Sequence, residues 1–262
     1  VVDDCSSDHL SLSDIRAFFP SVTWLFTNAN KGAGAARNLG VEHSEGDWLI
    51  FSDSDDEFMD DAFDIFDKNV GDDVDLVYFL AEGYNDITGS ESYRAERFND
   101  LVLWHLDEQS SCSLMNLKQR HVVPWAKMYR RECTKGFLFD EVMVGNDVAF
   151  NVLVALSCQS VRVVPEVVYT VTKRSGSLTT RKKSENFIAR VKISASLSNR
   201  VIAAGYRPLQ SGTGFLLESL SYGPLTLLKS IYIISRSSLS VDVLKLFQIS
   251  RWKRFFYLKR QN

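Results

Sequence analysis

The stretch Trp48-Leu49-Ile50-Phe51-Ser52-Asp53-Ser54-Asp55-Asp56 decides the fold of this chain. Its first four residues form a continuous apolar run, which is typical of a strand that is buried on both faces of a parallel sheet. Two carboxylates at alternate positions, Asp53 and Asp55, follow the run directly. Sheets of this kind bind ligands beyond the carboxyl ends of their strands. The stretch therefore predicts an α/β fold with a functional edge at Asp53.

Two similar units precede this stretch. Val1-Val2 runs into the polar turn Asp3-Asp4-Cys5-Ser6-Ser7-Asp8, and the strand-like residues 23–27 run into Asn28-Ala29-Asn30-Lys31-Gly32. A helix-forming segment, 34–43, joins the second unit to Trp48. Alternation of strand and helix predicts a mostly parallel central sheet flanked by helices, in the manner of a Rossmann-like fold. The three loops then meet at one edge.

The rest of the chain carries weaker patterns. The spacing of apolar residues predicts helices at 60–70, 147–156 and 184–204, strands at 75–80 and 161–171, and a partly helical segment at 116–131 with a break near Pro124. The remainder, to Asn262, is helical in character and basic.

Composition gives broad limits. The chain has 262 residues, of which 45% are hydrophobic and 24% charged, the mix of an ordinary globular protein. The formal net charge of −3 conceals a strong asymmetry: residues 1–75 hold eighteen acidic against four basic residues, whereas 173–262 hold seventeen basic against three acidic. An acidic half suits a divalent cation and repels nucleic acid, and a basic half suits phosphate or an anionic membrane. Two unevenly charged solvated faces are the alternative.

The cysteines and histidines indicate no metal centre. The four cysteines are scattered without a C-x-x-C pair, and the four histidines are equally dispersed. We interpret the cysteines as reduced thiols of a cytoplasmic protein. No apolar run reaches the ~18 residues of a spanning helix, and no signal peptide is visible.

Three segments have side chains suited to chemistry, and each has a structural alternative. Asp53 and Asp55 can hold a hard divalent cation such as Mn²⁺ or Mg²⁺, or they form an acidic turn that caps a following helix. The glycine-containing loop from Asn30 to Asn38 can bind phosphate at a helix start, or it is an ordinary flexible loop. Asp147, after Gly145-Asn146, is a candidate general base or a helix cap.

Together these segments resemble family 2 glycosyltransferases. The resemblance rests on six ordered segments, which are Asp3-Asp4-Cys5-Ser6-Ser7-Asp8, Lys31-Gly32 to Asn38, Asp53-Ser54-Asp55-Asp56, Val123-Pro124-Trp125-Ala126-Lys127-Met128-Tyr129, Gly145-Asn146-Asp147 and Arg174-Ser175-Gly176-Ser177. It implies a GT-A fold over 1–180, with a nucleotide-sugar half at 1–80 and an acceptor half at 81–180. Residues 181–262 are then a helical, basic extension.

The resemblance also implies the role of each site residue. Asp3 and Asp4 would contact the nucleotide base or ribose, Asp53 the ribose and the metal, and Asp55 the metal on the donor diphosphate. Lys31 and Arg37 would contact the donor phosphates, and Asp147 would be the base. Trp125 and Lys127 would line the acceptor side, with a core position as the alternative for Trp125. Arg174 and Ser177 would belong to a loop that closes over the donor.

Three departures from the family pattern stand out. Cys5 replaces a glycine, so the first turn must accept a side chain, and Asn146 replaces an acid, which removes a like charge that would raise the pKa of Asp147. The family pattern also has a strand, a loop and a helix before Asp3, so we expect the 262-residue chain alone to be unstable or inactive. Cooperative melting and activity of that chain would contradict this expectation.

The function implied is a metal-dependent inverting glycosyltransferase that uses a nucleotide-sugar, first of all a UDP-sugar, in surface polysaccharide biosynthesis. A sugar nucleotidyltransferase and a catalytically inactive nucleotide-sugar-binding module stay open as alternatives. Aromatic and basic residues alternate in Arg251-Trp252-Lys253-Arg254-Phe255-Phe256-Tyr257, which suits an anionic bilayer surface. We therefore also expect peripheral attachment to the inner face of the membrane, near a lipid-linked acceptor, unless this segment is a packed helix with solvated charges.

Overall fold

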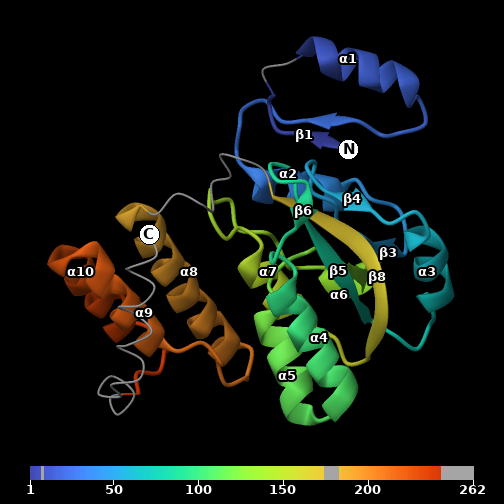
Figure 1. The fold of residues 1–262 in the computed structure, drawn as a ribbon. Coiled ribbons are helices and arrows are strands. Elements are labelled where there is room, and N and C mark those ends of the chain that lie inside the picture. The colour runs from blue at the N-terminus through green and yellow to red at the C-terminus, as the bar shows by residue number, and fades with distance from the viewer. Residues whose placement is uncertain (7–8, 174–182, 243–262) are drawn as a thin grey trace. The chain divides into compact units, whose positions relative to one another are not determined.

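The computed structural model describes residues 1–6, 9–173 and 183–242, without the side chains of 9–12. The chain forms two compact units, Val1–Ser177 and Leu178–Asn262. The first is the α/β unit in Figure 1, and the second is a group of helices. The basic segment 245–262 lies outside the described residues.

The first unit alternates short strands with helices. Its strands are β1 (Val2–Asp3), β2 (Leu25–Phe26), β3 (Trp48–Leu49), β4 (Glu57–Phe58), β5 (Leu76–Asn85), β6 (Ser90–Glu91), β7 (Lys127–Arg130) and β8 (Val161–Lys173). Its helices are α1 (His9–Phe18), α2 (Ala33–Glu42), α3 (Ala62–Asn69), α4 (Glu96–Glu108), α5 (Ser111–Arg120), α6 (Arg131–Thr134) and α7 (Val148–Ser157).

The main sheet has the order β3-β7-β5-β8-β4, with β6 paired to β5, and β1 and β2 form a separate parallel pair. β5 and β8 are parallel, whereas β7 lies antiparallel between β3 and β5. The predicted α/β architecture is confirmed, but the expected predominance of parallel pairing is wrong. β6, α4 and α5 lie between β5 and β7 in the chain, and β7 runs antiparallel to β5.

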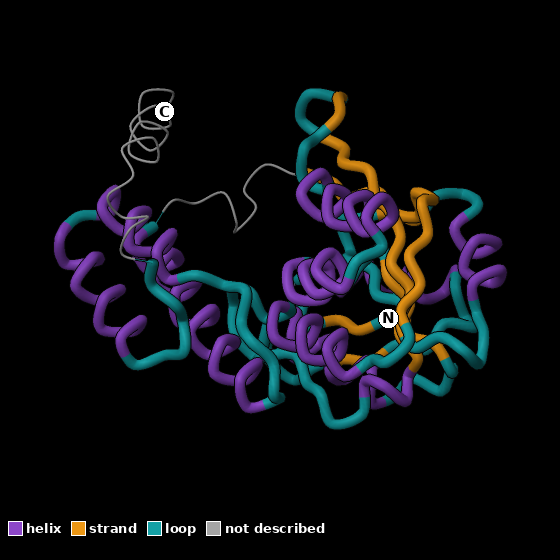
Figure 2. The backbone as a smooth tube through the Cα atoms, turned by 90° about the horizontal axis from the view of Figure 1, so that it is seen from below, coloured by secondary structure: helices purple, strands orange, loops and turns teal. Residues whose placement is uncertain are grey.

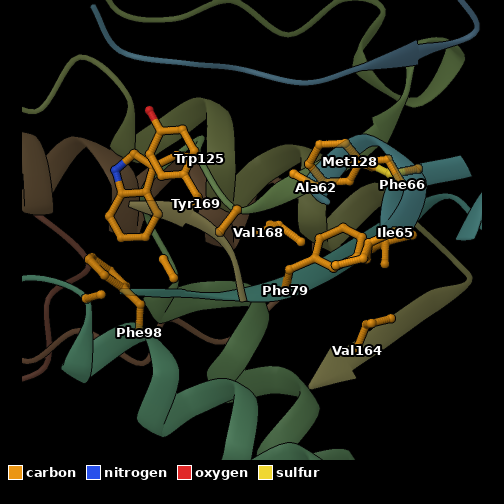
Figure 3. Close-up of a cluster of buried hydrophobic side chains, with 14 of the residues drawn as sticks. Ala62, Ile65, Phe66, Phe79, Phe98, Trp125, Met128, Val164, Val168 and Tyr169 are labelled. Atoms are coloured by element: carbon orange, nitrogen blue, oxygen red, sulfur yellow. The ribbon is translucent and has the colours of Figure 1, made fainter. Parts of the chain in front are cut away.

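Both faces of the sheet are covered, as the apolar strands predict. Alternate residues of β5 point to opposite faces: Val77 and Phe79 pack in one cluster with residues of α3, and Leu76 and Tyr78 pack in the other with residues of α7. Figure 2 shows helices on both sides of these strands, and Figure 3 shows the α3-side cluster. The candidate site lies in the turn after β3, which contacts Tyr169 and Thr172 of β8.

The predicted elements are recovered unevenly. The helices at 34–43, 60–70 and 147–156 correspond to α2, α3 and α7, and the strand at 161–171 corresponds to β8. The partly helical segment at 116–131 is wrong in its second half, where Lys127–Arg130 forms β7. This segment becomes a strand because it pairs with both β3 and β5.

The second unit consists of α8 (Ser184–Ala203), α9 (Gly212–Ser219), a short 3-10 turn (Leu220–Tyr222) and α10 (Pro224–Ser235). α8 matches the predicted helix at 184–204. The buried core of the second unit is small and includes Phe187, Val191 and Ile234. Among the described helices, none is long and apolar enough to cross a membrane.

Candidate functional site

The Asp53–Asp56 turn follows β3 and leads into the short strand β4, so it does not cap a helix. Two of its carboxylates are held by the protein. Arg37 forms a salt bridge with Asp53, and Asp56 accepts hydrogen bonds from the Thr172 amide at 2.8 Å and the Tyr169 hydroxyl at 3.1 Å. Asp55, in contrast, has no hydrogen-bond partner in the described part of the chain. The turn thus presents one carboxylate that is free to bind a ligand.

Tyr169 of β8 is a site residue that the sequence did not reveal. Its hydroxyl accepts a hydrogen bond from the Asp53 amide at 2.9 Å while it donates to Asp56. Burial, followed by the charges of Asp55 and Asp53, raises the pKa of Asp56 to about 6, although the Thr172 amide and Tyr169 oppose the shift. Because a strand tyrosine is usually a core residue, only its contacts mark it as a support of the turn.

Arg37 of α2 connects the turn to a segment far along the chain. Its guanidinium donates to Asp53 and, at 2.8 Å, to the side-chain oxygen of Asn146. Asn38 of the same helix exchanges hydrogen bonds with the backbone of Phe139 at 2.8 and 3.0 Å. Gly34 permits this approach, because a Cβ there would lie 2.2 Å from the Asp140 carbonyl oxygen. The predicted Gly-containing loop is therefore an ordered helix start that holds the 139–147 segment in place.

Asp147 stands at the N-cap position of α7 but makes no side-chain capping hydrogen bond. The cap alternative therefore does not account for it. The carboxyl is partly buried, and burial raises its pKa above the ordinary value, with Arg37 the strongest opposing charge and Asp53 a further raising one. Asp147 follows Asn146, and Arg37 contacts both Asn146 and Asp53, so the three charged side chains lie in one region of the first unit.

Lys127 lies behind this site and not on its surface. It is fully buried, and its ammonium donates to the His121 carbonyl at 2.7 Å and to the Asn151 side-chain oxygen at 3.1 Å. The expectation that Lys127 lines the acceptor side does not fit this burial. The same Asn151 oxygen accepts from Tyr129, and the Asn151 amide donates to the Asp147 carbonyl at 2.8 Å. Lys127 thus supports the start of α7, and burial holds its pKa well below the ordinary value.

The first loop uses its carboxylates within the protein. Asp4 accepts hydrogen bonds from the Thr27 hydroxyl and from the amides of Lys31 and Gly32, at 2.6–3.0 Å. Asp3 accepts from the Ser6 amide. Burial raises the pKa of Asp4, but these hydrogen bonds and the charge of Lys31 bring it below the ordinary value. Two amides of the loop predicted to bind phosphate, those of Lys31 and Gly32, therefore donate to Asp4, and the side chain of Lys31 is exposed.

The left-handed conformation of Cys5, with φ 59°, shows why glycine suits that position. A side chain is nevertheless accommodated there, because Cys5 is exposed.

Trp125 is a core residue in this structure, as its alternative interpretation held. Its side chain is 6% exposed and stacks on Tyr169 with ring centroids 5.9 Å apart (Figure 3). Phe98 meets it edge-on at 5.2 Å. Trp125 therefore steadies the tyrosine that holds the Asp53–Asp56 turn. Arg174 and Ser177 lie outside the described residues.

The donor set at the turn fits a hard divalent cation of low protein coordination. Among the described residues no group of three or more His, Cys, Asp or Glu side chains gathers into a closed cage. Mg²⁺ and Mn²⁺ in phosphate-binding sites take only one or two carboxylates, with phosphate oxygens and water as the other ligands. Asp55 offers one such carboxylate. Asp53 offers a second, which would have to bind the metal and Arg37 at the same time.

Comparison with known sequences decides the family. The sequence model of the family described as "Glycosyl transferase family 2" matches residues 1–137, more than half of the chain. The chain belongs to this family.

Curated relatives agree over shorter stretches. An uncharacterized glycosyltransferase of Haemophilus influenzae is 42% identical over 59 residues, which cover 22% of this chain and 19% of the relative. The putative glycosyltransferase EpsH of Bacillus subtilis is 33% identical over 104 residues, which cover 39% and 29%. The matched stretches thus span less than a third of these relatives.

Solved structures show the same fold. S. aureus TarS 1–349 in complex with UDP-GlcNAc superposes with a TM-score of 0.60 at 19% identity, over 89% of this chain and 70% of that one. The mannosyltransferase PcManGT of Pyrobaculum calidifontis, in complex with GDP-Man and Mn²⁺, gives 0.50 at 15% identity over 90% and 64%. The predicted GT-A fold and the family are therefore confirmed.

Proposed function

We propose that this protein is a metal-dependent inverting glycosyltransferase that moves a sugar from a nucleoside diphosphate to an acceptor hydroxyl. The observation that carries the proposal is the Arg37 bridge, which holds Asp53 of the acidic turn and Asn146 beside Asp147 in one site. The acidic turn also contains Asp55, whose carboxylate has no hydrogen-bond partner among the described residues, and Asp147, whose pKa is raised by burial, follows Asn146 directly.

The two carboxylates suit the two ends of a displacement reaction. Asp147 takes the proton of the acceptor hydroxyl while the hydroxyl oxygen bonds to the anomeric carbon and the bond to the nucleoside diphosphate breaks. A single in-line displacement inverts that carbon. Asp55, with Asp53, would hold Mn²⁺ or Mg²⁺, which neutralises negative charge on a diphosphate leaving group. Arg37 fixes the two carboxylate loops relative to each other.

The wider assignments follow the family resemblance. We propose a UDP-sugar as the donor and a saccharide or lipid-linked saccharide of a surface polysaccharide as the acceptor. Lys31 is exposed beside Asp4 and is suited to contact the donor. Asp3 and Asp4 would act by shaping the loop on which the nucleotide rests, since both carboxylates are already hydrogen-bonded. Arg174 and Ser177 would close over the donor, and the tail 245–262 would attach to an anionic membrane on the cytoplasmic side.

The test is donor hydrolysis and transfer with UDP-, GDP- and dTDP-sugars, with and without Mn²⁺. We expect metal-dependent turnover that falls by about 10²–10⁴-fold in Asp147→Asn and is lost in Asp55→Ala. Asp107→Asn, at an exposed position of α4 outside these segments, is the matched control and should retain full turnover.

Two other outcomes would change the proposal. Metal-dependent nucleotide binding that Asp55→Ala abolishes, without any turnover, would indicate an inactive binding module. Turnover that survives Asp147→Asn would remove Asp147 as the base.

A further inference from the structure

The exposed face of α10 is apolar, and its buried face is largely polar. Its buried residues are Thr226, Ser230 and Ile234, two of which are polar. Four large apolar side chains are exposed on the same helix: Leu225 (65%), Leu228 (63%), Ile231 (46%) and Tyr232 (58%). A surface helix of a globular protein normally has the opposite arrangement, with its apolar stripe inside. The outer face of α10 therefore has the composition of a contact surface.

The buried polar side chains of α10 need no further partner. The Thr226 hydroxyl donates to the Tyr222 carbonyl at 3.3 Å, and the Ser230 hydroxyl donates to the Thr226 carbonyl at 2.8 Å. Small residues on this side let α10 pack against α8 and α9. The buried side of α10 therefore carries no unsatisfied hydroxyl.

A shallow apolar groove runs between α10 and α8. It is lined by Ile188 and Lys192 of α8 and by Leu228, Lys229, Tyr232 and Ile233 of α10, with a volume of about 460 Å³. Among the described residues of this lining, the charged side chains are two exposed lysines, Lys192 and Lys229. The floor of the groove is apolar and its edges are cationic.

Positive charge continues around this face. The Arg236 guanidinium lies over the Tyr232 ring, 4.6 Å from its centroid. α10 contains no acidic residue, and Glu218 of α9 is paired with Arg190 at 3.0 Å. An apolar centre with a cationic border is complementary to an anionic lipid surface, where acyl chains meet apolar side chains and headgroups meet lysine. A second copy of the same face would instead bring two cationic borders together.

We propose that the α10 face, defined as Leu225, Leu228, Lys229, Ile231 and Tyr232 together with Lys192 of α8, docks on an anionic lipid bilayer. This surface is separate from the tail 245–262, and its docking extends the membrane attachment proposed above without depending on sugar transfer. The helix lies in the interface and does not span the bilayer, since its twelve residues are too few.

Vesicle flotation of the full chain tests the proposal. Phosphatidylcholine vesicles containing about 30% phosphatidylglycerol are compared with pure phosphatidylcholine, at about 0.1 M salt. We expect the protein to float with the anionic vesicles only. Leu225→Asp/Leu228→Asp should lower the partition coefficient by about tenfold or more, because two apolar anchors are lost and two like charges face the lipid.

Ile87→Asp is the matched control, because Ile87 is also 63% exposed but belongs to the first unit. It should float as the unchanged protein does. Lys192→Ala and Lys229→Ala should each weaken binding to anionic vesicles by about fivefold, which corresponds to about 1 kcal/mol per lysine. Thermal melts of all variants should coincide, since every changed side chain is exposed.

Three results would overturn the proposal. The first is absence of flotation, and the second is equal flotation of Leu225→Asp/Leu228→Asp and the unchanged protein, which would assign binding to the tail. The third is a dimer in light scattering that this double variant dissociates, without flotation, which would identify a second copy as the occupant. Donor hydrolysis in the absence of vesicles should be the same in the double variant, so failure of lipid docking and failure of the transferase proposal remain distinguishable.

Discussion

The two units of this chain treat apolar side chains in opposite ways. In the first unit, β5 and α7 bury almost every apolar residue, and the acidic residues Asp53, Asp55 and Asp56 stand in the turn after β3. In the second, α10 is nearly as apolar but leaves Leu225, Leu228 and Tyr232 exposed. Apolar content alone therefore does not separate a core element from a contact surface, and the difference lies in what packs against each face.

The sharpest test of this difference is the same kind of truncation in both units. Phe79 is fully buried and meets Phe66 edge-on at 5.3 Å, so Phe79→Ala should lower the free energy of unfolding by about 3–5 kcal/mol. Leu228→Ala should change it by no more than about 0.5 kcal/mol. Urea denaturation gives both values. A large loss of unfolding free energy in Leu228→Ala would mean that the Leu228 side chain is covered, and that the two units do not differ as described.

Loss of a buried polar side chain in the first unit should lower the free energy of unfolding almost as much. Asn151→Leu leaves the Lys127 ammonium and the Tyr129 hydroxyl without their shared acceptor, and should cost about 2–3 kcal/mol. Asn151→Asp keeps acceptor oxygens for Lys127 and Tyr129 but loses the amide that donates to the Asp147 carbonyl, so it should recover part of the loss. Equal stabilities of the two variants in urea denaturation would show that the hydrogen bonds to this oxygen do not support α7.

A smaller effect is expected where the core meets the acidic turn. Tyr169→Phe removes the hydroxyl that joins the Asp53 amide to Asp56 but keeps the stacking on Trp125. We expect a loss of about 1–2 kcal/mol in stability and weaker binding of Mn²⁺ with UDP, measured by calorimetry. Tyr78→Phe removes a buried hydroxyl of the other cluster that has no hydrogen-bond partner in the described part of the chain, and is the matched control that should leave Mn²⁺ binding unchanged. Unaltered Mn²⁺ binding in Tyr169→Phe would show that metal binding at the Asp53–Asp56 turn does not depend on the Tyr169 hydroxyl.

The mildest effect concerns pH. Because the pKa of Asp147 is raised in the folded protein, ionising this carboxyl costs stability as the pH rises from the unfolded pKa to the folded one. Asp147→Asn should therefore gain stability relative to the unchanged protein across this window and hold the gain above it. Urea denaturation at several pH values measures the gap, and a gap that closes with rising pH would contradict the burial of Asp147.

The raised pKa also sets the acidic limb of activity. A base must be ionised, so turnover should fall at a higher pH than it would with an exposed aspartate. Arg37→Met removes the strongest charge that opposes the shift, and should move this limb further upward. An unmoved limb in Arg37→Met would show that another group controls the acidic limb.

The sequence by itself determined the class of fold, the order of the motifs and the bounds of helices such as α2, α7 and α8. These features are local, because helical spacing and the positions of glycine and aspartate act within a few residues. The tertiary structure alone decided the mixed pairing around β7, the burial of Lys127 and the use of the Lys31 and Gly32 amides by Asp4. It also decided the Arg37 contact with Asn146, 109 residues away. Contacts of this kind depend on which elements pack side by side, and no short stretch of sequence contains that information.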